Sequence, residues 1–167
     1  MFREMRRIKQ ALSKEESIQI LEKGTSGVLA LSGDDGYPYA VPISYVYADS
    51  RLYFHSAKCG HKIDAILKCP KASFCVIEQD VVVPEKYTTF FRSVIAFGQI
   101  RILEESSEIR NAVEMLAVKY HPNDTEEGRQ KVIQQELNRL CMIELSIEQL
   151  SGKEAIELVN ALPQTRS

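Results

Sequence analysis

The 167-residue sequence predicts a mainly β fold, a closed antiparallel barrel with helices around it. Two observations lead to this prediction. Short segments rich in aromatic and β-branched residues follow one another closely, with Gly, Asp, Ser or Pro between them. Amphipathic helical patterns lie between and around these segments, and no internal repeat or convincing linker interrupts the order. The chain is therefore expected to form a single domain over residues 1–167.

The first half of the chain predicts one helix followed by a three-stranded meander. The helix is expected in "LSKEESIQILEKG", where Ser13 and Glu16 have the spacing of a capping box and Gly24 is a natural stop. The turn "GDDG" separates the apolar run at 28–31 from "YAVPISYVYA" at 39–48. "DSR" makes the next turn and leads into a third strand, "RLYFHSA".

The second half predicts more strands and helices, joined by two connections and followed by a tail. In order, we expect a short helix at 60–70, strands at 72–80 and 93–104, a helix at 106–122, a helical stretch at 131–140 and a final strand at 141–155. Residues 81–92 are either an extended connection or the start of a long strand. Residues 123–130 are expected to begin a polar loop, and residues 158–167 a frayed tail.

Composition excludes several classes of protein. The net charge of −2 and the pI of about 6.0 argue against a general nucleic-acid binder, which would carry a basic surplus. No apolar run approaches the length of a membrane span, and the N-terminus lacks the apolar region of a secretory signal. The four cysteines form no CxxC pair. A cytoplasmic protein with reduced thiols is the expectation.

The stretch "LYFHSAKCGHKIDAI" at 52–66 allows three interpretations. A metal site would use His55, Cys59 and His61, but their spacing matches no familiar zinc pattern. A cysteine nucleophile would pair Cys59 with His61, although residues two apart rarely face each other and a catalytic cysteine usually takes its base from elsewhere. A solvated loop cysteine explains Cys59 better, and we expect no metal site.

The third interpretation, a phosphate cradle, fits the stretch best. Ser56 supplies a hydroxyl at a strand end, and Gly60 permits a sharp turn into a helix. The first turn of that helix offers unpaired N–H groups and a positive dipole end, which favour an anion. His61 and Lys62 stand at this terminus, where a cation otherwise meets the positive end of the dipole. From these residues alone, a solvated loop with surface charges explains the pattern equally well.

Longer segments of the chain resemble a known family. "GVLALSGDDGYPYAVPISYVY", "LYFHSAKCGHKIDAI", "SFCVIEQD", "FRSVIAFGQIRIL" and "SGKEAIELV" are similar, in this order, to the flavin-binding split-barrel proteins related to pyridoxamine 5′-phosphate oxidase. The 5-nitroimidazole-resistance branch is the more similar one. This resemblance implies a six-stranded antiparallel split barrel of Greek-key type. It also implies a homodimer with one FMN per subunit, bound in a cleft between the two chains.

The resemblance also implies a set of cofactor-binding residues. The phosphate-binding turn falls on His55, Ser56, Ala57, His61 and Lys62. The segment whose backbone faces the isoalloxazine ring falls on Pro42, Ile43, Ser44 and Tyr45. A second basic phosphate ligand falls on Arg92, with Thr89, Phe91 and Ser93 beside it. Lys62 and Arg92 are expected at the same barrel rim; a surface strand residue is the alternative for Arg92.

One departure from the family leaves the substrate open. The arginine-rich C-terminal stretch that would hold a vitamin phosphate is missing, and only Arg166 lies there. We therefore expect a flavoprotein reductase in which NAD(P)H reduces FMN, or FAD, and the flavin then reduces a small acceptor such as a nitroimidazole. His55 is the expected proton-transfer residue, since imidazole exchanges protons near neutral pH. The alternatives are a non-catalytic flavin carrier or sensor and a haem-binding protein, for which His121 is a candidate ligand.

Overall fold

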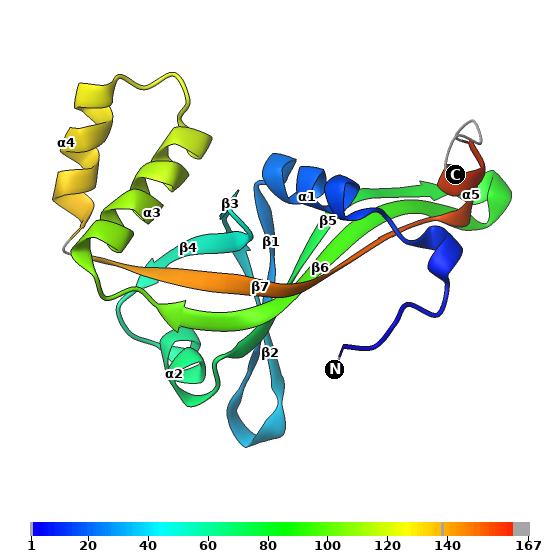
Figure 1. Cartoon of the computed structure of the whole chain (residues 1–167), viewed down its shortest axis with the longest axis horizontal. Helices are drawn as coiled ribbons and strands as arrows, with labels where there is room; N and C mark the ends of the chain where they lie inside the picture. Colours follow the sequence, from blue (N-terminus) through cyan, green and yellow to red (C-terminus); the bar gives the residue numbers. More distant parts are fainter. Residues whose placement is uncertain (1, 138, 162–167) are drawn as a thin grey trace.

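The computed structural model describes residues 2–137 and 139–161 and has a mainly β architecture, as predicted. All strands belong to one antiparallel sheet in the order β2-β1-β5-β6-β7-β4-β3 (Figure 1). The strands are β1 (Ser26–Ser32), β2 (Pro38–Ser44), β3 (Val46–Ala48), β4 (Arg51–Ala57), β5 (Lys71–Val83), β6 (Thr88–Ile102) and β7 (Leu140–Glu154). The sheet therefore has seven strands in an open order, which corrects the expectation of a six-stranded barrel.

The additional strand arises because one chain segment is divided at Tyr45. β2 pairs with β1 at one edge of the sheet, whereas β3 pairs with β4 at the other edge. Tyr45 lies between the two ladders, and its backbone N–H contacts both the Tyr120 hydroxyl, at 3.0 Å, and the Thr25 carbonyl, at 3.4 Å. Because the two edge strands are consecutive in the sequence, the sheet bends round until its two edges meet at Tyr45.

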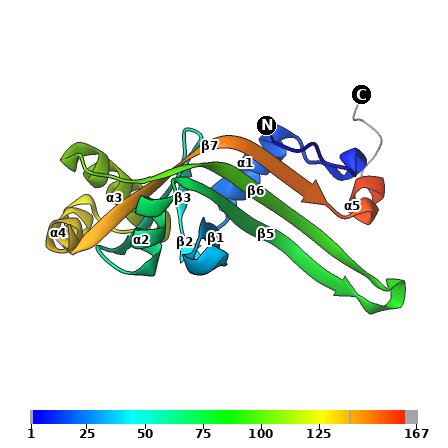
Figure 2. The same cartoon turned by 90° about the horizontal axis from the view of Figure 1, so that it is seen from below.

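β5 and β6 form a long hairpin that extends beyond the rest of the sheet (Figures 1 and 2). The turn is a single 3-10 turn, η3 (Pro84–Lys86), closed by Tyr87 in the left-handed conformation. Residues 81–92 thus belong to two long strands, which decides between the two expectations for this segment. Ile77, Val81 and Val82 are exposed on this hairpin, at 63%, 51% and 68% of their surface.

The helices cover the ends and one face of the sheet. α1 (Lys14–Lys23) has the predicted capping box between Ser13 and Glu16. The others are α2 (His61–Lys68), α3 (Ser106–Tyr120), α4 (Glu126–Glu136) and α5 (Ile156–Ala161). The polar loop expected at 123–130 is wrong in part, because the Thr125 side chain accepts a hydrogen bond from the Gly128 N–H and α4 begins at Glu126. Likewise α5 replaces the first part of the expected tail, and residues 162–167 lie outside the described part.

Two apolar clusters hold these elements together. The larger cluster lies inside the curved sheet and is closed by α1 and α2; Tyr45 and Phe54 pack edge-on against Phe74 there, with ring centroids 4.9 and 5.1 Å apart. The second cluster lies on the outer face, where α3 and α4 pack against β3 and β7 through residues such as Leu116, Ile133 and Met142. The helical pair therefore adds a separate layer outside the sheet (Figure 1).

At Gly98 the backbones of β6 and β7 leave no room for a side chain. The register of this pair shifts between Phe97 and Gly98. A Cβ atom placed on Gly98 would lie 1.9 Å from the backbone oxygen of Ser146 and 2.9 Å from its carbonyl carbon. The bulge thus requires a residue without a side chain.

The helices give no sign of a membrane span. Over residues 2–137 and 139–161, no helix is both long and apolar enough to cross a bilayer.

Candidate functional site

The candidate site begins where the strands β2 and β4, the second of which carries β3 on its edge, diverge from each other. β3 pairs with β4 from Ala48–Arg51 to Val46–Tyr53, and the ladder stops there. Beyond this point β2 bonds only to β1, and β4 bonds to β7, in the pairings that the structure describes. The expected ring-facing residues lie on one of these edges and the expected phosphate residues on the other: Pro42, Ile43 and Ser44 on β2, and His55, Ser56 and Ala57 on β4.

Pro42 agrees with this placement. β2 is an edge strand, and a proline, which has no N–H group, is tolerated in a sheet mainly at such an edge. Backbone groups on the free side of β2 are therefore available to a ligand rather than to another strand.

The turn between β4 and α2 has the features of an anion site. Gly60 has φ 115°, a conformation that side chains rarely adopt, and no side chain caps the first turn of α2. The N–H groups of Ile63 and Asp64 bond to the Gly60 carbonyl. Ser56 lies near the end of β4, where it pairs with Cys141. We call residues 56–62 the α2 cradle.

Lys62 is the cation of this cradle and is partly buried. Burial lowers the pKa of Lys62, whereas the nearby Cys141 thiol acts in the opposite direction. Burial in turn raises the pKa of the Cys141 thiol, and Lys58 and Lys62 oppose that change. An ammonium group that has lost part of its hydration gains more from a phosphate partner than a fully solvated one does.

His61 is held by the neighbouring hairpin instead of pointing freely at a ligand. Its ring stacks on Tyr39 with centroids 4.0 Å apart, and its Nε2 lies 3.6 Å from the Asp34 carboxylate. Lys68, at the other end of α2, lies 3.6 Å from the same carboxylate. These contacts fix the orientation of α2 against the β1–β2 hairpin, so the His61 backbone is better placed for an anion than its side chain.

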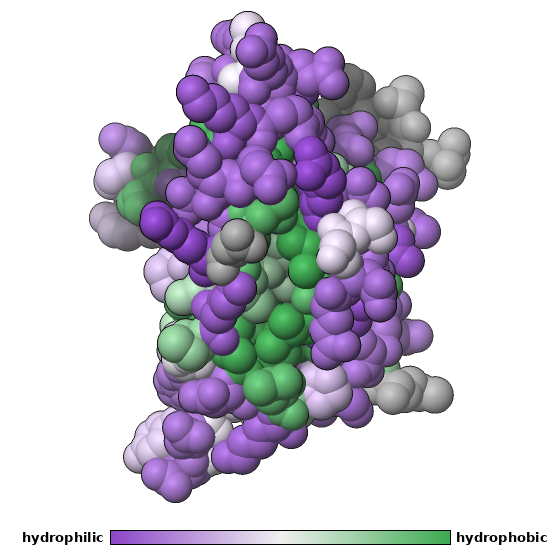
Figure 3. Space-filling model, turned by 90° about the vertical axis from the view of Figure 1, so that its left-hand side faces the viewer, coloured by the Kyte–Doolittle hydropathy of each residue, from purple (hydrophilic) through white to green (hydrophobic). Residues whose placement is uncertain are grey.

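An apolar pocket opens beside the diverging edges, between α3, α4 and the sheet. It has a volume of about 400 Å³. Its lining residues are Ser44, His55, Val113, Leu116, Ala117, Tyr120, Val132, Ile133, Glu136, Leu140 and Met142. Figure 3 shows apolar side chains gathered in a hollow on this side of the molecule. We call it the α3–α4 pocket; it brings together two expected site residues, Ser44 and His55.

Tyr120 and Lys119, which the sequence did not single out, fasten the end of α3 to the strand break at Tyr45. The Tyr120 hydroxyl accepts from the Tyr45 N–H and lies within hydrogen-bond distance of the carbonyls of Tyr45 and Thr25. The Lys119 ammonium donates to the Gly24 carbonyl and lies 4.4 Å from the centre of the Tyr45 ring. A tyrosine near a helix end carries no sequence signal for such a contact, which only the fold creates.

Tyr45 itself is part of the core. Its hydroxyl donates to the Leu21 carbonyl at 2.8 Å, and its side chain is fully buried. Burial raises the pKa of Tyr45. The Tyr45 side chain is therefore not accessible to a ligand. The other expected ring-facing residues, Pro42, Ile43 and Ser44, keep accessible backbone groups on the edge strand β2.

We expect Tyr120→Phe to destabilise the protein by about 1 kcal/mol, since it removes a hydroxyl that bridges the strand break. For a domain of this size the melting temperature should fall by roughly 2–4 °C. Amide exchange at Tyr45 should accelerate as well. Tyr37→Phe is the matched control, because Tyr37 is 75% exposed at a turn and should change neither quantity. Unchanged exchange at Tyr45 in Tyr120→Phe would contradict the role assigned to the hydroxyl.

The structure does not bring Arg92 to the α2 cradle of the same chain, which corrects the expectation of a shared rim. Arg92 pairs with Glu154 near one end of β7, whereas Ser56 pairs with Cys141 near the other end. Thirteen strand residues correspond to roughly 40 Å. Thr89, Phe91 and Ser93 lie on the same long strand, β6.

Arg92 sits among three carboxylates. Its guanidinium lies 3.1 Å from Glu154, 3.2 Å from Glu78 and 3.9 Å from Glu16. Glu154 is 2% exposed, so at least one of these ion pairs is shielded from solvent. This network gives Arg92 a structural role, and a phosphate would have to compete with the three carboxylates for the guanidinium.

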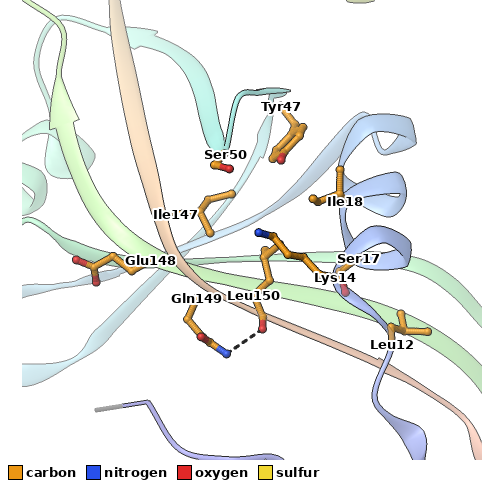
Figure 4. A pocket seen from close by; sticks show the side chains of 10 residues that line it. All are labelled: Leu12, Lys14, Ser17, Ile18, Tyr47, Ser50, Ile147, Glu148, Gln149 and Leu150. Carbon is orange, nitrogen blue, oxygen red and sulfur yellow. Dashed lines mark hydrogen bonds between the residues drawn. The ribbon is translucent and has the colours of Figure 1, made fainter. Parts of the chain in front are cut away.

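Other candidate features remain apart from this region. A pocket of about 340 Å³ between α1, the β3–β4 turn and β7 is lined by residues such as Lys14, Tyr47 and Gln149 and contains none of the expected site residues (Figure 4). His121 is solvent-exposed at the end of α3 and lies 3.7 Å from Asp124. Among the described residues, no three His, Cys, Asp or Glu side chains are grouped so as to hold a metal ion.

Comparison with known proteins gives the class. A family model described as pyridoxamine 5′-phosphate oxidase matches residues 13–154. The chain therefore belongs to this family of flavin-binding split-barrel proteins. No protein in the comparison with curated sequences matches it.

Solved structures share the fold. A protein from Bacteroides thetaiotaomicron, named provisionally for 5-nitroimidazole antibiotic resistance, has a TM-score of 0.71 at 19% identity, with 86% of each chain covered. An FAD-binding protein from Mesorhizobium loti has a TM-score of 0.60 at 26% identity, covering 87% of this chain and 97% of the other. The FAD and heme binding protein from Mycobacterium smegmatis has a TM-score of 0.71 at 21% identity, covering 93% and 80%.

The residues present fit a flavin nucleotide. A free strand edge, at Pro42–Ser44, suits the hydrogen-bonding edge of a flavin ring, and the α2 cradle suits its phosphate. The cradle combines an uncapped helix start, a hydroxyl at Ser56 and the partly desolvated Lys62.

Proposed function

We propose that this chain is a flavin-dependent oxidoreductase that binds FMN, or FAD, between the free edge of β2 and the α2 cradle. The observation that carries the proposal is the divergence of β2 from β4 directly beside an uncapped helix start that bears Lys62. Ser56 and Lys62 hold the phosphate, and the backbone of residues 42–44 orients the ring. The FAD-binding protein from Mesorhizobium loti, at 26% identity, supports a flavin in this fold.

The bound flavin supplies the redox chemistry, taking electrons from NAD(P)H and giving them to a small acceptor. The protein orients the flavin and the acceptor and transfers protons. We assign proton transfer to His55; its exposure on β4 and its position in the lining of the α3–α4 pocket, which also includes Ser44, support this assignment. A nitroaromatic acceptor is consistent with the similarity to the Bacteroides protein.

The decisive experiment is an absorption spectrum of the purified protein followed by anaerobic titration with NADH and NADPH. A flavin spectrum that bleaches with either donor and recovers on adding a nitroaromatic supports an oxidoreductase. A flavin that binds but never bleaches would identify a carrier or sensor. A Soret band after adding haem, without flavin absorption, would favour the haem-binding alternative.

The proposal includes a homodimer. The long β5–β6 hairpin leaves Ile77, Val81, Val82 and Tyr87 exposed, and Tyr87 has 98% of its surface accessible. A two-stranded ribbon with so much apolar surface is marginally stable alone, and a symmetric partner would cover it. We expect sedimentation at micromolar concentration to show a dimer, and a stable monomer there would contradict this part.

Mixed dimers test whether Arg92 reaches the cradle of a partner subunit. The Lys62→Ala and Arg92→Ala chains are co-expressed, and the mixed dimer is separated from the two homodimers. If Arg92 reaches the partner's cradle, the mixed dimer has one intact site of two and should hold about half of the wild-type flavin content. Each variant alone should bind flavin weakly. Full flavin binding by Arg92→Ala alone would instead assign Arg92 to the carboxylate network only. The two variants should be checked for dimer formation first, so that a folding defect is recognised.

A further inference from the structure

We propose that the α3–α4 pocket binds an uncharged, flat aromatic molecule and rejects phosphorylated or otherwise anionic ones. The inference deepens the proposed function by naming the class of its second substrate. It rests on three independent properties of the pocket: its apolar walls, the sign of the charge at its rim, and the placement of its polar groups.

The walls are apolar on three sides. Val113, Leu116 and Ala117 come from α3, Val132 and Ile133 from α4, and Leu140 and Met142 from β7. A volume of about 400 Å³ lies within the usual range for small-molecule sites. Figure 3 shows a hollowed apolar area on this side of the molecule. Such walls favour a ligand with a large apolar area.

The charge at the rim excludes anions. Of the described residues that line the pocket, none is lysine or arginine, and Glu136 adds a carboxylate. An anion would lose hydration against apolar walls and meet a like charge. The α2 cradle has the opposite character, because its Lys58 and Lys62 both lie near the Cys141 thiol of β7. The two neighbouring sites therefore separate an anionic group from a neutral one.

Three polar residues, Ser44, His55 and Tyr120, also line the pocket, and Ser44 and His55 belong to the two strands that diverge, β2 and β4. A carbonyl or nitro oxygen of the ligand can accept hydrogen bonds from these groups while its rings contact the apolar walls. A quinone, for example, gains two electrons and two protons to become a hydroquinone: a bound flavin, reduced by a nicotinamide, would supply the equivalent of a hydride, and His55 would relay the other proton from solvent.

The test uses two molecules of similar size that differ in charge: 2-acetonaphthone, which is neutral, and 2-naphthoate, which is an anion. Equilibrium dialysis against the purified full-length chain gives both dissociation constants without any turnover. We expect the neutral ketone to bind at least tenfold more tightly. Glu136→Gln should reduce that ratio by about threefold, because the exposed carboxylate is partly screened. Equal affinities in the wild-type protein, or tighter binding of the anion, would overturn the proposal.

Variants that fill the pocket locate the ligand. Ala117→Phe and Val132→Phe each place a ring in the pocket, and Val132 is 56% exposed, so the second change should not disturb folding. Both should weaken 2-acetonaphthone at least fivefold. Val118→Phe is the matched control: Val118 is 44% exposed on the same helix but does not line the pocket, and it should bind normally. Wild-type affinity in Val132→Phe would overturn the proposal.

Flavin content measured on the same samples separates the two hypotheses. If the protein holds flavin but binds the ketone and the anion equally, the inference about the pocket is wrong and the proposed function stands. If the protein binds the ketone selectively but holds no flavin, the proposed function is wrong and the inference about the pocket stands.

Discussion

Replacing Lys62 by alanine is expected to weaken FMN binding ten- to hundredfold. The substitution removes a charge-assisted contact to the phosphate, and such contacts contribute about 1.5–3 kcal/mol. The loss should be at the upper end, because burial has already lowered the pKa of Lys62 and the ammonium lacks full hydration to compensate. Quenching of flavin fluorescence during titration measures the dissociation constants.

Riboflavin provides an internal control for this experiment, since it has the same ring and no phosphate. The wild-type protein and Lys62→Ala should bind riboflavin equally. Lys68→Ala is the matched protein control: Lys68 is on the same helix, but it lies at the other end and contacts Asp34. Its effect on FMN affinity should stay below about twofold, as surface ion pairs contribute little. An unchanged FMN dissociation constant in Lys62→Ala would show that the phosphate binds elsewhere.

Gly98→Ala is expected to destabilise the fold by about 3 kcal/mol, the upper range for inserting atoms into a packed site. The new Cβ would lie 1.9 Å from the Ser146 carbonyl oxygen, and backbone atoms on both strands have no rotamer by which to move aside. The melting temperature should fall by roughly 6–12 °C. Urea unfolding followed by circular dichroism gives the free energy directly.

Gly36→Ala separates steric from conformational effects. Gly36 has φ 79°, yet a Cβ there would meet nothing within 4 Å. Its substitution should therefore cost only the strain of a left-handed residue, about 1 kcal/mol. A Gly98→Ala protein as stable as Gly36→Ala would mean that β6 and β7 can separate at the bulge without loss.

Local signals in the sequence predicted most of the fold. The capping box at Ser13 and Glu16 and the "GDDG" turn depend on neighbouring residues only, so their chemistry is readable from the chain. The strand break at Tyr45 was not predictable in this way. At this break the Tyr45 N–H contacts the hydroxyl of Tyr120, 75 residues further along the chain, and such a long-range contact leaves no local signal. The start of α4 was missed because its first turn is polar, and only the Thr125 cap marks it.

The candidate site was predicted to a similar extent. The α2 cradle combines residues close in sequence, and the structure places Ser56 opposite Cys141, whose thiol also lies near Lys62. Arg92 was placed at the same rim because both segments begin or end strands, but the register along β7 separates them. The α3–α4 pocket has no sequence signature, since its walls come from residues such as Leu116, Ile133 and Met142 that read as ordinary core.

The position of β7 in the chain has a consequence for biosynthesis. β7 is the last strand among the described residues, and it bonds to β4 on one side and β6 on the other. One side of β4 therefore stays unpaired until β7 has been synthesised; Arg51, for example, pairs with Ser146. A ribosome that has released the first 139 residues therefore presents two unpaired strand edges and half of an apolar interior, the condition under which nascent chains associate wrongly. The interval is short at ordinary elongation rates, but truncation within this last strand should abolish folding rather than merely weaken it.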